Sequence, residues 1–316
     1  MKTIFRSLTL LLSTFIIALG YCNVQADPYS GAPTATGPAK KYGYLLFAND
    51  TVPLFNKIVV VIGENTSPTS VIGNSKDAPY INSLAQSGAN FTQSYAIQHP
   101  SQPNYLDLFS GFDQRVAQNL KPEGHFTTPN LARELINAGK IFISYSEDLP
   151  GVGYDGISSG LYVRKHNAVA NWMGKKKNQV SAAINQPFTA FPSAFSLLPD
   201  VSFVIPNVCN DGHNLCLPLN NSVKQFDLWI QDHLDAYKRW CIDNNSLLIV
   251  TYDEDDYSGD NRIVTVFYGT HVTVGNYSQK INLYNILRTI EDGMGLSAHA
   301  GYAAEATPIT YCWSLQ

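Results

Sequence analysis

The sequence has too few charges, and too even a balance of them, to favour a nucleic-acid partner. Lys and Arg number 21 against 25 Asp and Glu, and charged residues make up 15% of the chain. The formal net charge of -4 gives no basic patch that would attract a polyanion, so we expect no nucleic acid among the partners. The chain also lacks a hydrophobic run of the roughly 20 residues that a membrane span needs, and we expect no stable membrane insertion.

Residues 1–26 are typical of a secretory signal peptide. The segment has a positive start (Lys2, Arg6), an apolar core (8–19) and small residues before a cleavage point (24–26). An uncleaved membrane anchor is the alternative, but the apolar core is short for one. We therefore predict a secreted or periplasmic protein, with 27–50 as a loose leader rich in Pro, Gly, Ala and Ser.

Cysteine is sparse as well, and no pair has the CxxC spacing of a structural zinc site. Four cysteines remain after the predicted signal, and an even number in an exported chain favours two disulfides. Cys209 with Cys216 would close a short loop, and Cys241 with Cys312 would hold the C-terminal tail. This is one of three possible pairings.

Residues 51–316 contain no internal repeat, linker or charge run, so we expect a single domain with a large core. Apolar runs predict strands at 57–62, 95–97, 141–145, 201–205, 246–252 and 261–268. Helical periodicity predicts helices at 79–87, after Pro103, at 129–138, at 222–243 and at 282–292. This alternation favours an α/β fold with a mostly parallel central sheet and helices on both faces. The long irregular region 146–201 is of the kind that carries function.

A strand is predicted to lead into a helix through residues 100–103, with Ser101 where the chain turns. Serine is a preferred N-cap, and proline is tolerated in a first helical turn. The first amides of a helix would stabilise an anion brought to this hydroxyl. Ser101 is therefore either a plain cap or a nucleophile, and caps are the commoner case.

Acidic residues follow two predicted strands. Glu64 and Asn65 come after 57–62, and Asp253 and Glu254 begin a run of four acids after 246–252. Ligands collect beyond the carboxyl ends of parallel strands, and four adjacent carboxylates would repel one another without a cation. Carboxylate and amide oxygens suit a hard divalent ion. Solvated acidic turns are the alternative.

Two histidines lie where a site is expected. His166 stands in the irregular region, in Tyr-Val-Arg-Lys-His-Asn, and His213 ends Asn-Asp-Gly-His after the strand 201–205. A lone histidine in a loop is usually a solvated surface residue. An adjacent aspartate such as Asp211, however, can orient or charge-balance an imidazole.

The motifs VVVIGEN, HPSQPNYLDLFSG and VTYDEDD occur in this order, and the chain resembles a bacterial and fungal phosphoesterase family over residues 57–296. That family includes secreted acid phosphatases and phospholipase C enzymes, relatives of alkaline phosphatase. The resemblance implies an alkaline-phosphatase-like fold and hydrolysis of phosphate esters.

The resemblance also implies a role for each candidate residue. Ser101 would be the nucleophile and would form a phosphoserine. Contacts to phosphate would come from His166 and His213, with His99 less directly involved. One divalent cation would lower the pKa of the serine hydroxyl. Its ligands would be Glu64, Asn65, Asp253 and Glu254.

The chain departs from the family at Leu283, where many members have a histidine. Either His271 takes over some of its work or the step it assists is weaker here. Our main prediction is an exported, metal-dependent phosphomonoesterase of the acid phosphatase type, with phosphoinositide headgroups among the candidate substrates. The alternatives are a phospholipase C-type phosphodiesterase and a non-catalytic exported binding protein on the same scaffold.

Overall fold

The computed structural model describes residues 51–314. The predicted signal peptide and leader lie outside these residues. Within 51–314, no helix is both long enough and apolar enough to cross a bilayer.

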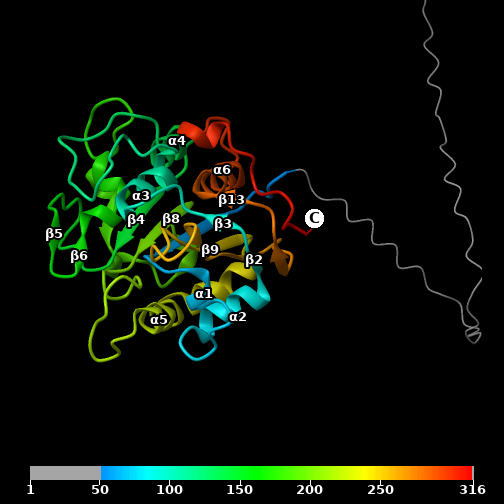
Figure 1. Cartoon of the computed structure of the whole chain (residues 1–316). Coiled ribbons are helices and arrows are strands. Elements are labelled where there is room, and N and C mark those ends of the chain that lie inside the picture. The colour runs from blue at the N-terminus through cyan, green and yellow to red at the C-terminus, as the bar shows by residue number, and fades with distance from the viewer. Residues whose placement is uncertain (1–50, 315–316) are drawn as a thin grey trace, which may run out of the picture. The chain divides into compact units, whose positions relative to one another are not determined.

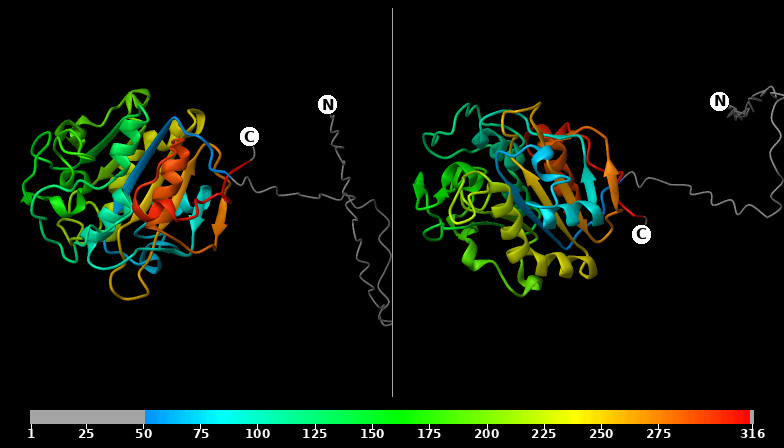
Figure 2. Two further views of the ribbon diagram at one scale, coloured as in Figure 1. Left: turned by 90° about the horizontal axis from the view of Figure 1, so that it is seen from above. Right: turned by 60° about the horizontal axis from the view of Figure 1, so that its bottom comes forward.

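A sheet of eight strands forms the centre of the fold (Figures 1 and 2). In spatial order the strands are β12 (Gly275–Tyr277), β2 (Ala89–Phe91), β11 (Thr265–Gly269), β9 (Ser246–Tyr252), β1 (Lys57–Gly63), β8 (Val201–Ile205), β4 (Phe142–Ser146) and β7 (Asn185–Pro187). Five neighbouring pairs are parallel, and only β11 runs antiparallel to its neighbours. The predicted α/β class with a mostly parallel sheet is confirmed.

Strand β1 lies in the middle of this sheet because both of its faces are buried. Its residues 58–62 are all β-branched, and none is more than 1% exposed, as expected of a strand covered on both sides. β1 pairs in parallel with β8 on one side and with β9 on the other. The carboxyl ends of these three strands therefore share one edge of the sheet.

Helices cover both faces of the sheet. They are α1 (Pro68–Val71), α2 (Pro79–Ser87), α3 (Ser101–Ser110), α4 (Leu131–Asn137), α5 (Ser222–Asp243) and α6 (Leu283–Gly293). In Figure 1, α3, α4 and α6 lie on one side of the sheet, and α1, α2 and α5 lie on the other. α2 is fixed to α5 by Asp227, whose carboxylate accepts hydrogen bonds from the backbone N–H groups of Tyr80 (3.1 Å) and Ile81 (2.7 Å). An anion at a helix N-terminus is stabilising, and α2 has no cap of its own.

The predicted bounds of α2, α5, β8 and β9 agree with the structure. Helix α6 begins one residue later than predicted because Asn282 is its N-cap and forms a capping box with Asn285. Helix α4 is shorter than predicted because Asn130 caps it, accepting a 3.0 Å hydrogen bond from Arg133 N–H.

Two strand predictions were wrong in extent. The strand expected at 95–97 is β3 (Ser94–Tyr95), which pairs with β10 (Arg262–Ile263) and β13 (Ile281–Asn282) in a separate small sheet. The strand expected at 261–268 is divided into β10 and β11, because the chain passes from the small sheet to the central one at Val264.

The region 146–201 is built from short elements. It contains the hairpin of β5 (Ser158–Ser159) and β6 (Tyr162–Val163). The short 3₁₀ helices of the described chain are Arg164–His166, Ala168–Asn171, Ala182–Ile184, Phe188–Ala190, Phe195–Leu197 and Gly301–Ala304. Arg164 is buried and anchors this region through Asp155 (2.9 Å) and Asn171 (2.6 Å).

One of the two predicted disulfides is present. Cys209 and Cys216 are bonded, whereas Cys241 and Cys312 are free, so the second predicted pair is wrong. Both free thiols are buried, and Cys241 Sγ donates to the carbonyl oxygen of Lys238 one turn earlier in α5. Burial raises the pKa of the Cys241 thiol to about 12. These two residues act as small apolar parts of the core.

Candidate active site

Two acidic segments meet beyond the carboxyl ends of β1 and β9. The parallel register places Gly63 opposite Tyr252, so the residues that follow each strand continue side by side. Asp253 N–H donates to Gly63 O (3.0 Å), and Glu64 follows at once. The parallel pairing of β1 with β9 therefore brings together segments that are almost 190 positions apart in the chain.

Glu64, Asp253 and Glu254 form a buried acidic cluster. Each is at most 2% exposed, and one carboxylate oxygen of each lies within 4.8 Å of the others. Asp253 Oδ2 has no hydrogen-bond partner among residues 51–314. Burial, with Glu64 and Glu254 nearby, raises the pKa of Asp253 well above its usual range, and burial also raises that of Glu254. Three buried carboxylates with an unused oxygen are what a hard divalent cation binds.

Asn65 lies at the rim of this cluster. Its φ of 43° is in the left-handed region, which asparagine tolerates better than most residues. Its N–H donates to Asp253 Oδ1 (3.2 Å), and its side-chain amide donates to Glu254 Oε1 (3.1 Å). Asn65 Oδ1 lies 3.5 Å from the Ser101 hydroxyl. The structure thus brings all four predicted metal ligands together.

Ser101 is the first residue of α3, and Pro100 occupies the N-cap, so of the two alternatives for Ser101 the structure excludes the plain cap. Its hydroxyl is 1% exposed and points into the acidic cluster. Ser101 Oγ lies 2.9 Å from Glu254 Oε1 and 3.1 Å from Glu64 Oε2. A hydroxyl carries one hydrogen, so it can donate to only one of the two at a time.

The N-terminus of α3 offers less to an anion than the sequence suggested. Gln102 N–H already donates to Asn119 Oδ1 (2.9 Å), and Pro103 has no N–H. The loop before the helix is held by Asn104. Its Oδ1 accepts hydrogen bonds from the N–H groups of Ile97 and Gln98, both at 3.1 Å. Sequence reasoning missed both asparagines: Asn104 lies within the motif HPSQPNYLDLFSG but was given no role, and Asn119 belongs to no motif.

His166 is buried. It lies against Oε1 of Glu64, whereas Ser101 lies near Oε2 of the same carboxylate. Its Nε2 is 2.7 Å from Glu64 Oε1, and its Nδ1 is 3.1 Å from Asp211 Oδ2. Burial lowers the pKa of His166, but these two carboxylates outweigh burial and raise it. Both nitrogens therefore face carboxylates, which favours a charge-balancing role over the direct phosphate contact that was predicted. Tyr105, missed by sequence reasoning, stacks on this imidazole with ring centroids 5.2 Å apart.

The protonated imidazole acts in turn on Glu64. Burial would raise the pKa of Glu64, yet His166 outweighs it, Lys165 and His213 add to the effect, and the pKa falls to about 2. Glu64 is therefore ionised across the physiological range, whereas burial and the neighbouring carboxylates favour the protonated form of Asp253 relative to an exposed aspartate.

His213 and His99 are accessible at the edge of the site. His213 is exposed, its N–H donates to Asp211 Oδ1 (2.8 Å), and its ring lies 6.0 Å from that of His166. His99 Nδ1 is 2.5 Å from Glu254 Oε2, and its ring stacks on Tyr257. His213 can therefore reach a bound substrate, and His99 orients Glu254.

Leu283 and His271 do not join this cluster. Leu283 is fully buried in the hydrophobic core at the start of α6. His271 Nε2 lies 2.9 Å from Asn245 Oδ1, and Asn245 precedes β9, whereas the acidic cluster follows β9. His271 and the acidic cluster therefore lie at opposite edges of the sheet, so the suggestion that His271 substitutes for a missing site histidine was wrong.

Comparison with known proteins identifies a family and several relatives of this chain. Residues 74–297 match the model of the Phosphoesterase family. A phosphatidylinositol-3-phosphatase from Mycobacterium tuberculosis is 46% identical over 268 residues, which cover 84% of this chain and 85% of that protein. An acid phosphatase from Aspergillus fumigatus is 30% identical over 206 residues, covering 59% of this chain and 43% of that protein.

Among solved structures, a protein of the alkaline phosphatase superfamily from Vibrio parahaemolyticus superposes with a TM-score of 0.58 at 13% identity. The match covers 80% of this chain and 69% of that one. At this identity the likeness concerns the fold, and it confirms the alkaline-phosphatase-like architecture.

Proposed function

Because the chain belongs to the Phosphoesterase family, and is thus a phosphoric ester hydrolase, we propose that it cleaves phosphate monoesters through a phosphoserine at Ser101. The observation that carries this proposal is the position of the Ser101 hydroxyl. It is buried at the start of a helix, 2.9 Å from Glu254 and 3.1 Å from Glu64.

A divalent cation fits the acidic cluster. Glu64, Asp253 and Glu254 would hold it with carboxylate oxygens, and Asn65 would add its amide oxygen after a rotation of the side chain. When bound, the cation would neutralise the buried acids and lower the pKa of a nearby hydroxyl. The partnerless Asp253 Oδ2 supports this assignment on the chain's own geometry.

The side chains supply the remaining chemistry. Ser101 Oγ attacks phosphorus as the ester oxygen leaves on the opposite side, and its proton passes to the carboxylate that accepts its hydrogen bond. His166 keeps Glu64 ionised and in place. His213, with its exposed ring, contacts the phosphoryl oxygens or protonates the departing alcohol. Water then hydrolyses the phosphoserine and releases inorganic phosphate.

The substrate we propose is a small phosphate ester, with phosphoinositide headgroups as the leading class. The similarity to a protein named phosphatidylinositol-3-phosphatase over most of both chains supports this choice. We also propose that residues 1–26 direct export.

A trapping experiment tests the mechanism. The protein, supplied with a divalent cation and nitrophenyl phosphate, is quenched in acid and digested, and the peptide carrying Ser101 is examined by mass spectrometry. One added phosphate on Ser101 is expected. Turnover by wild-type protein without any phosphorylated peptide, under conditions in which hydrolysis of the intermediate limits the rate, would contradict the covalent route.

A further inference from the structure

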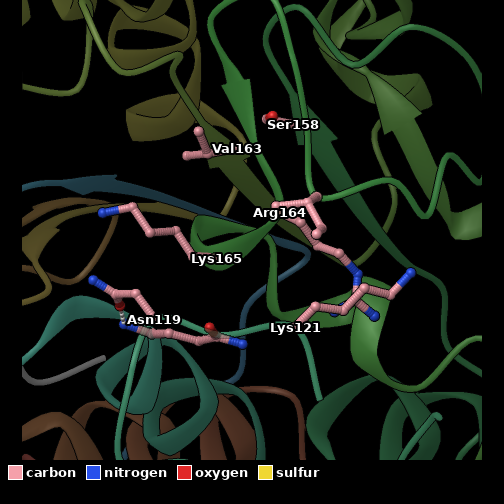
Figure 3. A pocket seen from close by; sticks show the side chains of 8 residues that line it. Asn119, Lys121, Ser158, Val163, Arg164 and Lys165 are labelled. Atoms are coloured by element: carbon pink, nitrogen blue, oxygen red, sulfur yellow. Dashed lines mark hydrogen bonds between the residues drawn. The ribbon is translucent and has the colours of Figure 1, made fainter. Parts of the chain in front are cut away.

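A pocket is lined by residues that directly follow Ser101 and directly precede His166 in the chain. It has a volume of about 240 Å³, and its walls include Gln102, which follows Ser101, and Lys165, which precedes His166. Asn119, Lys121, Ser158 and Arg164 complete its polar lining, and Ile157 and Val163 form its apolar wall (Figure 3). The acidic cluster and this pocket are therefore joined through adjacent residues of the chain.

Lys165 is the uncommitted cation of this pocket. It is partly buried, and within residues 51–314 its ammonium has neither a hydrogen-bond nor an ion-pair partner. By contrast, Lys121 donates to Asp155 O (2.6 Å), and Arg164 pairs with the Asp155 carboxylate (2.9 Å). Figure 3 shows Lys165 extending away from Arg164 and Lys121, whose nitrogens lie on the other side of the view.

Two amides beside Lys165 have unused hydrogen-bonding groups. Gln102 is 1% exposed, and its Oε1 has no partner among the described residues. Asn119 uses its Oδ1 to accept from Gln102 N–H, which leaves its NH₂ group unused within the described chain. Asn119 is exposed, so water can solvate its NH₂ group, whereas the buried Gln102 oxygen costs stability unless a ligand or water satisfies it. The pocket thus presents one free cation and two amides to whatever enters it.

We propose that this pocket binds a second anionic group of the substrate, carried by the alcohol that leaves when the phosphate is transferred to Ser101. The inference rests on the proposed function and narrows its substrate class to phosphate monoesters with a second phosphate on the alcohol part. An ammonium recognises phosphate as a point charge, and the Asn119 NH₂ group can donate to its oxygens, whereas Gln102 Oε1 can accept a hydrogen bond from a hydroxyl of the alcohol part.

The size of the pocket agrees with such a ligand. Its volume is below the range of about 300–1,000 Å³ that is usual for sites of drug-sized ligands, which suits a headgroup rather than a whole lipid. A phosphorylated inositol that carries a second phosphate has this chemistry, whether free in water or attached to a lipid.

The experiment compares substrates with one and with two anionic groups. Nitrophenyl phosphate has one, and inositol 1,3-bisphosphate and a short-chain phosphatidylinositol 3-phosphate have two. We expect Lys165→Gln to lower the ratio of kcat/KM for either two-phosphate substrate to kcat/KM for nitrophenyl phosphate by about tenfold, the usual effect of losing a hydrogen bond to a charged group. Lys165→Arg should restore most of the ratio, and Lys175→Gln, a change at an exposed lysine, should leave it unchanged.

The two arms separate the sources of the ligand. Dependence on Lys165 with the soluble bisphosphate shows that the headgroup alone is recognised. Dependence on Lys165 that is seen with the lipid and not with the bisphosphate shows that the second phosphate is recognised as the phosphodiester of the lipid. Either result supports the pocket. A ratio that Lys165→Gln leaves unchanged in both arms overturns it.

A binding measurement keeps this test apart from the proposed function. Titration calorimetry of inositol 1,3-bisphosphate into Ser101→Ala protein should show binding that weakens about tenfold when Lys165→Gln is added. Equal affinity of the two proteins for the bisphosphate, and also for the short-chain lipid in the same measurement, overturns the pocket even if the enzyme is active. Absence of hydrolysis by wild-type protein, with Lys165-dependent binding intact, overturns the proposed function and leaves the pocket standing.

Discussion

The hydroxyl of Ser101 lies 2.9 Å from the carboxylate of Glu254, although the two residues are 153 positions apart in the chain. Their meeting depends on the parallel pairing of β1 with β9 and on the loop that delivers α3 to the same edge of the sheet. The five predictions that follow test this arrangement and its surroundings.

Ser101→Ala should abolish turnover, because it removes the serine hydroxyl that lies 2.9 Å from Glu254 and 3.1 Å from Glu64 in the acidic cluster. We expect kcat for nitrophenyl phosphate to fall by about a thousandfold or more, the usual effect of removing a nucleophile. Ser110→Ala is the matched control, since Ser110 is buried in the same helix and bonds only to local carbonyls and Gln114. A variant that keeps a tenth of the wild-type rate would remove Ser101 as nucleophile.

Asp253→Asn should weaken divalent cation binding, because it removes a carboxylate whose Oδ2 has no hydrogen-bond partner within the described part of the chain. We expect at least about a tenfold loss of affinity, a smaller rise in melting temperature on adding metal, and loss of activity. Asp256→Asn is the control, because Asp256 is exposed and bonds to Ser67 and Ser258 instead. Metal content is measured by mass spectrometry. Full activity of wild-type protein after exhaustive chelation would contradict the cation site.

His166→Gln should destabilise the fold, because it leaves the buried charge of Glu64 without its partner. We expect a loss of about 3–5 kcal/mol in the free energy of unfolding, measured with urea in the presence of chelator so that no cation replaces the imidazolium. Adding Glu64→Gln should recover part of this loss. His233→Gln, at an exposed position of α5, serves as control. A loss below about 1 kcal/mol would mean that the two charges are not coupled.

Stability should fall as pH rises from about 4 to about 8. Burial raises the pKa of Asp107 to about 7 and that of Glu291 to about 8, above their usual values of 3.8 and 4.5. Over this range the folded state holds protons that the unfolded state releases, so unfolding becomes easier with each step in pH.

The residues responsible can be separated by substitution. Asp107→Asn, which keeps an acceptor for the Tyr284 hydroxyl, and Glu291→Gln should each flatten the dependence of unfolding free energy on pH. Asp243→Asn, at an exposed position, should not. Urea titrations at several pH values give the slopes, and an unchanged slope in both variants would show that these carboxyls do not govern it.

Leu283→His should destabilise the protein without a gain in activity, although the family pattern favours histidine there. Leu283 is fully buried among apolar residues, so an imidazole at this position would lose contacts and bury polar atoms. We expect a loss of about 2–4 kcal/mol in unfolding free energy, with Leu283→Met costing less than about 1.5 kcal/mol. Higher activity in the histidine variant at unchanged stability would show that this position reaches the site.

The sequence by itself determined the fold class and most of the helices and strands. The β-branched run of β1 and the apolar spacing of α5 are local signals. A run that is apolar on both faces is buried as a central strand, and a helix with one apolar side packs that side on the sheet. The acidic residues after β1 and β9 could also be predicted to meet, because parallel strands end at one edge.

Only the tertiary structure decided how the groups of the site are paired. In the structure, His166 faces Glu64 and Asp211, and the backbone N–H of Gln102 donates to Asn119. Cys241 and Cys312 are unbonded, and His271 lies at the edge of the sheet opposite the acidic cluster. These outcomes depend on contacts between segments far apart in the chain. No periodicity or motif encodes such distances, since they follow from how the whole core packs.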